Sequence, residues 1–461
     1  MAWADTMIGI SSRVGSCFLA VFLSLLFPPL SSASESPHVP YESDGYLSLR
    51  YQFRNAKSST QSWNDQDIFS ELRLDITQPQ PGYFEFHFLG IYRKDIDGDR
   101  EPRTFYPTED IGDTGNHSAK TYISEAHLDV NNLLSGVPQL RFGRQTGTRD
   151  EPVFFDGIAV DLAAWDRINL TLYGGAAVHF SELYREQGDD FLAGAGLDLQ
   201  VSRSTSLSID YLGADDERMY PSVTDAQDNM LSFKLWHRFS PGLRAMAKYR
   251  YLNGDPRDFS LRAVALYAPA DIEVNANYFR QFTVQKELAN EFSVYYDIIG
   301  QSAPYETYDV KARKLFGEHY ALDLGYYSRD LREKQNESSF NRRYNRAYAT
   351  VEMLELLLPG LSLSITGEAW RSWERAYRTW GGDLSYTFPV NTKKATVSTG
   401  SYFSLYKYDY YIERGERTKA RTYFVNARYP LRPDLWLNAA YEFEQAVEDY
   451  QTVKLGMRYD F

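Results

Sequence analysis

Apolar and polar residues alternate with a period of two along most of this chain. In the segment 45–54 the apolar positions are Leu47, Leu49, Tyr51 and Phe53, and polar residues stand between them. The last segment, 450–461, has the same pattern up to its final residue. Strict alternation over about ten residues predicts a β-strand with one apolar face and one polar face.

The pattern recurs often enough to predict 22 strands, or about 18–20 if two segments fold back as loop hairpins. The predicted strands are 45–54, 67–77, 83–93, 120–130, 138–146, 153–162, 167–178, 190–201, 205–214, 228–239, 242–252, 257–268, 271–282, 305–316, 319–330, 342–356, 361–373, 376–388, 394–408, 419–429, 434–445 and 450–461.

The connections between these segments differ in length according to their parity. Connections from an even to an odd segment are mostly short, whereas the longest ones run from odd to even segments: 55–66, 94–119, 215–227 and 283–304. Membrane barrels have short periplasmic turns and longer extracellular loops. We therefore predict an all-β fold, a single closed antiparallel transmembrane β-barrel with the long loops outside the cell.

The composition fits this prediction and excludes other classes of protein. The 461 residues are 15% aromatic and 24% charged, with a mean hydropathy of −0.47. Past residue 30 there is no run of 18 apolar residues, which excludes a bundle of membrane-spanning helices. A net charge of −13 without a basic patch argues against a nucleic-acid partner.

The first residues resemble a targeting segment. The apolar run 17–27 is too short to span a bilayer and suits the core of a signal peptide, with cleavage expected after Ala33. The predicted organisation is a signal peptide over 1–33, a short periplasmic segment over 34–44 and the barrel over 45–461.

Cysteine usage limits the chemistry of the mature chain. The single cysteine, Cys17, lies within the predicted signal peptide. Once the signal peptide is removed, the mature chain has no cysteine, which excludes disulfides, thiolate metal sites and the C-x-x-C-H attachment of haem. We therefore expect no cofactor.

The chain ends at Phe461 after an alternating strand, which resembles the assembly signal of bacterial outer-membrane barrels. The segments 140–145, 155–157, 170–175 and 290–300 resemble outer-membrane porin-like families, including the alginate-export type. The resemblance implies location in the outer membrane, contact with its lipid and lipopolysaccharide, and recognition of Phe461 by the barrel-assembly machinery. It carries over no alginate-binding residue.

The polar face of the strands carries many charges of both signs. So many charges would be costly in a dry core and are tolerated in a wet channel. We expect opposite charges on neighbouring strands to cross-link the wall, with no strong ion selectivity. The predicted pore-lining residues are Arg50, Arg54, Glu71, Arg73, Asp75, Glu85, His87, Glu125, His127, Asp129, Arg244, Lys248, Arg250, Lys311, Arg313, Arg428, Glu442, Lys454 and Arg458.

A barrel of this size raises the question of what narrows it. Known 22-stranded transporters are plugged, and the segment 34–44 is too short to form a plug. The loop 283–304 is the predicted constriction because it holds an apolar cluster, whereas 94–119 is a solvated external loop. The residues expected to constrict the lumen are Phe292, Tyr295, Tyr296 and Ile298.

One cluster of titratable residues stands out on the third and fourth segments. If residue 93 pairs near residue 121, His87 faces His127 and Glu85 faces Asp129 inside the barrel. Such a cluster could bind a divalent metal or relay protons. Arg73 nearby would oppose a cation, so we expect a structural polar cluster and no metal.

Other motifs for enzymatic or calcium chemistry are weak. The acidic stretch 95–101 lacks the glycine that a calcium loop needs at its sixth position and is expected to be a solvated surface loop. The chain has no G-x-S-x-G motif, so we expect no catalytic residues.

These observations predict an outer-membrane channel for small hydrophilic solutes. The alternative is the barrel sheath of a multi-protein conduit, either for electrons with a periplasmic cytochrome as partner or for polysaccharide export.

Overall fold

The structure of the chain is a computed structural model. It describes residues 41–57, 62–78, 84–96, 119–146, 153–178, 190–215, 227–283, 303–337, 341–355, 358–372, 375–405, 419–446 and 449–461. The predicted signal peptide and constriction residues lie outside these ranges. Among the described residues, no helix has the length and apolar character needed to cross a membrane.

The described residues form 22 strands and two short 3-10 helices, which confirms the predicted number of strands. The elements are β1 (Glu42–Lys57), β2 (Ser62–Thr77), β3 (Phe84–Asp95), β4 (Ala119–Leu134), β5 (Val137–Thr146), β6 (Phe154–Trp165), β7 (Ile168–Ala177), β8 (Phe191–Ser202), β9 (Thr205–Asp215), β10 (Gln227–Ser240), β11 (Leu243–Leu252), β12 (Asp255–Tyr267), η1 (Ala268–Ala270), β13 (Ile272–Gln281), β14 (Tyr305–Phe316), β15 (Tyr320–Leu331), η2 (Lys334–Asn336), β16 (Tyr344–Leu354), β17 (Leu361–Ser372), β18 (Ala376–Val390), β19 (Lys393–Ser404), β20 (Ala420–Arg432), β21 (Leu435–Gln445) and β22 (Asp449–Asp460).

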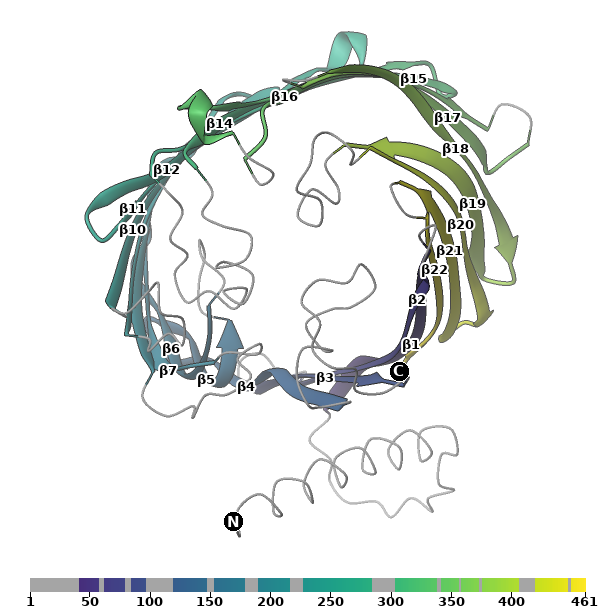
Figure 1. Ribbon diagram of the computed structural model, residues 1–461. Helices are drawn as coiled ribbons and strands as arrows, with labels where there is room; N and C mark the ends of the chain where they lie inside the picture. Colours follow the sequence, from purple (N-terminus) through teal and green to yellow (C-terminus); the bar gives the residue numbers. More distant parts are fainter. Residues whose placement is uncertain are drawn as a thin grey trace, which may run out of the picture.

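The strands close into one antiparallel barrel. Each strand pairs with its neighbours in sequence, and β22 pairs with β1 to complete the ring (Figure 1). At the seam, the backbone N–H of Gly45 donates to the carbonyl oxygen of Phe461 at 3.1 Å, and the N–H of Phe461 donates back at 3.0 Å. Closure leaves no unpaired sheet edge, which a lipid environment requires.

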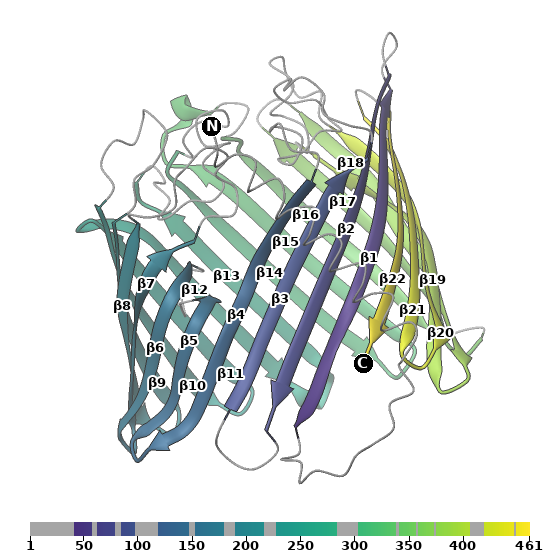
Figure 2. The same ribbon diagram turned by 90° about the horizontal axis from the view of Figure 1, so that it is seen from below.

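The connections follow the predicted parity. Those from even to odd strands are short turns such as 135–136, 203–204 and 391–392, while 96–118 and 282–304 join odd to even strands. Figure 2 shows the short turns gathered at one end of the tilted strands. By the architecture of membrane barrels, this end is the periplasmic one.

Several predicted strand boundaries are wrong, most of all those of the first hairpin. The loop expected over 55–66 is mostly strand, because β1 and β2 stay paired until Lys57 pairs with Ser62. β22 accompanies β1 to Lys57, whereas β2 extends beyond β3, whose last residue pairs with Asp67. The first strand also starts at Glu42 rather than at residue 45, since the pairing with β2 extends that far. Backbone pairing prolongs strands into sequence that has lost its alternation.

The outward face of the barrel is apolar. Its large side chains remain exposed, as Leu455 does with 51% of its surface accessible. A closed barrel of 22 strands with this outer surface is a transmembrane barrel of the bacterial outer-membrane type. Other residues of this face are Leu49, Phe142, Leu172, Leu261, Leu324 and Val397.

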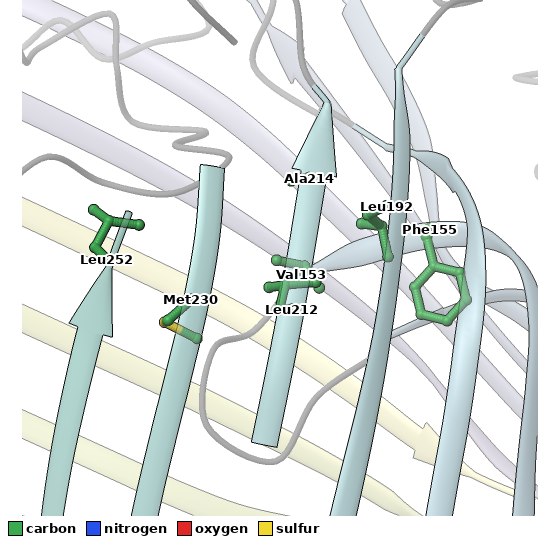
Figure 3. Close-up of a cluster of buried hydrophobic side chains, with 7 residues drawn as sticks. All are labelled: Val153, Phe155, Leu192, Leu212, Ala214, Met230 and Leu252. Atoms are coloured by element: carbon green, nitrogen blue, oxygen red, sulfur yellow. The ribbon is translucent and has the colours of Figure 1, made fainter. Parts of the chain in front are cut away.

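A cluster of buried apolar side chains lies on the opposite, lumenal face, where the sequence predicts polar residues. Phe155 and Leu192 are fully buried, and Leu212, Met230 and Leu252 follow one another across β9, β10 and β11 (Figure 3). All lie near the long-loop ends of their strands. These side chains therefore form one buried cluster on the lumenal face at this end.

Single cysteines will test which end faces the cell exterior. Ser62→Cys at the tip of the β1–β2 hairpin is expected to react with an impermeant maleimide in intact cells, and Asp166→Cys in the β6–β7 turn is not. Both should react once the outer membrane is permeabilised. Labelling of residue 166 alone in intact cells would invert the assignment of the two ends.

Candidate functional site: the lumenal wall

The strand register places every predicted pore-lining residue on the face opposite to the exposed apolar side chains. Arg50 and Lys454, for example, alternate with outward Leu49 and Leu455 along paired strands. The same holds across β3–β5, β10–β12, β13–β15 and β20–β22. Their part in lining a conducting pore stays a prediction.

Opposite charges cross-link neighbouring strands, as predicted. Arg54 on β1 pairs with Asp65 and, at 2.9 Å, with Asp67 on β2. The carboxylate of Asp67 has no accessible surface and also lies 3.3 Å from Arg93 on β3. This network ties three adjacent strands together.

A second network spans β14 to β16. Arg313 lies 2.7 Å from Asp323 on β15 and also pairs with Glu352 on β16. One guanidinium thus serves two carboxylates, which its fork of donors allows. On β11, Arg250 pairs with Asp258 of β12 at 2.8 Å.

The predicted His cluster forms with the predicted register. His87 pairs with His127, and Glu85 pairs with Asp129. A β-bulge between Leu89 and Gly90 shifts the remaining pairs by one residue. The extra residue, Ser124, lies on β4, so without the bulge the long-loop end of β4 would show its other face, whereas β3 keeps an unshifted pairing with β2.

Asp129 is the most buried carboxylate of this cluster. Only 1% of the residue is accessible. Arg141 on β5 donates to both oxygens, at 2.6 and 2.8 Å, and Gln139 donates to Oδ2 at 2.9 Å. These three donors balance the charge of a carboxylate that is nearly removed from water.

A row of aromatic rings, which the sequence pattern did not predict, crosses the lumenal face at the long-loop end of β13–β19. Tyr327 stacks on Tyr344 at 5.5 Å, and Tyr344 stacks on Trp370 at 5.7 Å. Arg346 lies over the Trp370 ring and pairs with Glu368, to which the indole N–H donates at 2.8 Å. In the sequence, each ring lies on the predominantly polar side of a strand with alternating apolar and polar residues. Only the register between strands shows that the rings are neighbours in space.

The predicted constriction residues, Phe292 to Ile298, lie outside the described residues, and the structure places only the ends of their loop. Phe282 contacts Tyr249 with ring centroids 5.6 Å apart. On the other side, the N–H of Ala303 donates to Asn341 at 2.9 Å.

No family model and no curated protein matches the chain. Solved structures of similar shape include three from Pseudomonas. They are Pseudomonas aeruginosa OpdK with vanillate (TM-score 0.45, 11% identity, 91% of this chain and 98% of that chain), a BenF-like porin from Pseudomonas fluorescens Pf-5 (TM-score 0.44, 12% identity, 91% and 98%) and Pseudomonas aeruginosa OccK2 (OpdF) with glucuronate (TM-score 0.44, 10% identity, 91% and 96%). Vanillate and glucuronate are the compounds present in the OpdK and OccK2 structures.

Proposed function

We propose that this outer-membrane barrel is a porin-like channel for small hydrophilic solutes. The observation that carries the proposal is the contrast between its two faces. The outer face is apolar, and the inner face carries ionised side chains along almost every described strand. That pattern is stable where lipid lies outside and water lies inside.

The energetic argument rests on how the charges are solvated. An isolated charge in a dry medium is very costly, and even a paired one needs several hydrogen-bonding partners. Many wall charges, such as Lys311 and Arg458, keep about half of their side-chain surface accessible. Water in the lumen would solvate them, which supports an aqueous path.

The pairing of charges also bears on selectivity. In the described wall, arginines such as Arg54, Arg250 and Arg313 have carboxylate partners within 3 Å. A wall of matched pairs presents little net potential to a passing ion. The proposed channel therefore discriminates only weakly between cations and anions.

Single-channel recording of the refolded protein in planar bilayers tests the proposal. We expect stepwise conductance with weak ion selectivity. We further propose that the loop 283–304 narrows the lumen, so deletion of residues 287–301 should raise the conductance several-fold. The matched control is deletion of 97–115 in the other long loop, which should change the conductance much less.

Two outcomes would contradict these proposals. Equal conductance of the wild type and the 287–301 deletion would show that this loop is not the constriction. No conductance from either protein, despite correct folding, would overturn the channel and favour the sheath of a multi-protein conduit.

A further inference from the structure

His87 and His127 face each other on adjacent strands near the periplasmic mouth of the barrel. Their ring centroids lie 4.8 Å apart, and the planes are tilted by 31°. His87 is half-buried and His127 is buried with 7% exposure.

The hydrogen bonds of the two rings fix which nitrogens are available. Nδ1 of His127 lies 3.3 Å from the backbone carbonyl oxygen of Arg144, which can only accept, so this nitrogen carries the proton. Nδ1 of His87 lies 2.6 Å from a carboxylate oxygen of Asp75 and likewise donates. In the neutral rings, both Nε2 atoms then present free lone pairs.

This arrangement is typical of metal-binding histidines. A histidine that ligates a metal through one nitrogen usually donates its other N–H to a carboxylate or a backbone carbonyl. Here one ring has the carboxylate of Asp75 and the other has a carbonyl. The supporting contacts come from β2 and β5, the strands on either side of the histidine pair.

Two carboxylates complete the set of donors. Nε2 of His87 lies 3.6 Å from Oε2 of Glu85 and 3.8 Å from Oδ2 of Asp129. Nε2 of His127 lies 4.0 Å from Oδ1 of Asp129. These separations are too long for hydrogen bonds. One ligand atom from each of His87, His127 and Asp129 lies within 4.8 Å of the other two. Small side-chain movements would bring them to the roughly 3.4 Å between neighbouring ligands of a tetrahedral zinc ion.

The arginines around the cluster do not leave an excess of positive charge. Arg73, whose place near His87 predicted that it would oppose a cation, is paired with Asp75 at 2.7 Å. Arg141 is paired with Asp129. Beyond these two pairs, the remaining charge of the cluster is the carboxylate of Glu85. The two arginines and three carboxylates therefore carry one net negative charge when both imidazoles are neutral.

The contacts of Asp129 indicate which of its oxygens can bind a metal. Oδ2 already accepts from Arg141 and Gln139, whereas Oδ1 accepts only from Arg141. Each carboxylate oxygen has two lone pairs. Oδ1 therefore keeps one lone pair, on the oxygen nearer to His127.

We propose that His87 Nε2, His127 Nε2, the Glu85 carboxylate and Asp129 Oδ1 form a binding site for a divalent first-row transition ion of the zinc type. Two imidazoles with two carboxylates suit zinc better than magnesium or calcium, which prefer oxygen ligands alone. The bound ion joins β3 to β4 in the lumenal wall. The site does not depend on whether the lumen conducts.

Titration of the refolded full chain in detergent with Co²⁺ tests the site, because tetrahedral cobalt absorbs visible light strongly, and Zn²⁺ should then displace the cobalt. We expect one ion per chain. His87→Gln and His127→Gln should each weaken binding more than about 100-fold, and Asp75→Asn about 10–100-fold as a supporting residue.

His319→Gln is the matched control, since His319 lies in a periplasmic turn away from the cluster. Each variant must first show heat-modifiable mobility in gels, which reports a folded barrel. The proposal is overturned if the wild type shows no saturable cobalt spectrum, if folded His87→Gln and His127→Gln bind as the wild type does, or if His319→Gln loses binding equally.

Discussion

Leu455→Arg is expected to leave most of the protein unfolded under conditions in which Lys454→Glu folds fully. Leu455 lies midway along β22 with 51% of its surface exposed on the outward face. An arginine facing lipid at mid-bilayer depth costs about 2–4 kcal/mol. Lys454 lies on the lumenal face between Gln52 and Ala440. In the proposed aqueous lumen, a charge of either sign stays solvated there.

The measurement is the folded fraction of each variant in lipid vesicles across a urea series, followed by heat-modifiable mobility. The two substituted residues are adjacent on the same strand, so both variants change a residue at nearly the same depth in the membrane and differ in the face that carries the change. Equal loss of folding from both would mean that the faces of β22 are not divided between lipid and water.

Arg141→Met is expected to lower the free energy of unfolding by about 3 kcal/mol, because it leaves the buried carboxylate of Asp129 without its main partner. Asp129 keeps only the donor from Gln139. The matched control is Arg432→Met, whose pair with Asp434 is 59% and 39% exposed. Such an exposed pair contributes about 0–1 kcal/mol.

Urea unfolding with a chelator present measures both variants without any contribution from bound metal. The double variant Arg141→Met with Asp129→Asn should recover part of the lost stability, since no unpaired charge then remains. A loss for Arg141→Met no larger than that for Arg432→Met would show that water reaches Asp129 freely.

The His cluster shows how far a local pattern can place residues in space. Alternation along two consecutive strands put His87, His127, Glu85 and Asp129 on one face, and the structure brings them together as expected. The partners of the imidazole Nδ1 atoms were not predictable. They come from Asp75 and the Arg144 carbonyl, on strands whose register no local signal fixes.

The aromatic row and the buried apolar cluster were missed for a related reason. Tyr344 and Trp370 belong to the polar side of their own strands and are isolated there in sequence. They become neighbours only through the stagger of β16 against β17. Stagger is set by closure of the whole ring and not by any one strand.

The sequence by itself determined the number of strands to within about four, the face of each strand that meets lipid and the end of the barrel that carries the long loops. These follow from the alternation of apolar and polar residues with a period of two, which is present in each strand independently of the other strands. The tertiary structure decided what a single strand cannot encode. It set the register at the β1–β22 seam, the bulge beside Gly90, the length of the β1–β2 hairpin and the contacts around Asp129. Each of these depends on pairing between residues far apart in the chain, and a closed ring must satisfy all of its pairings at once.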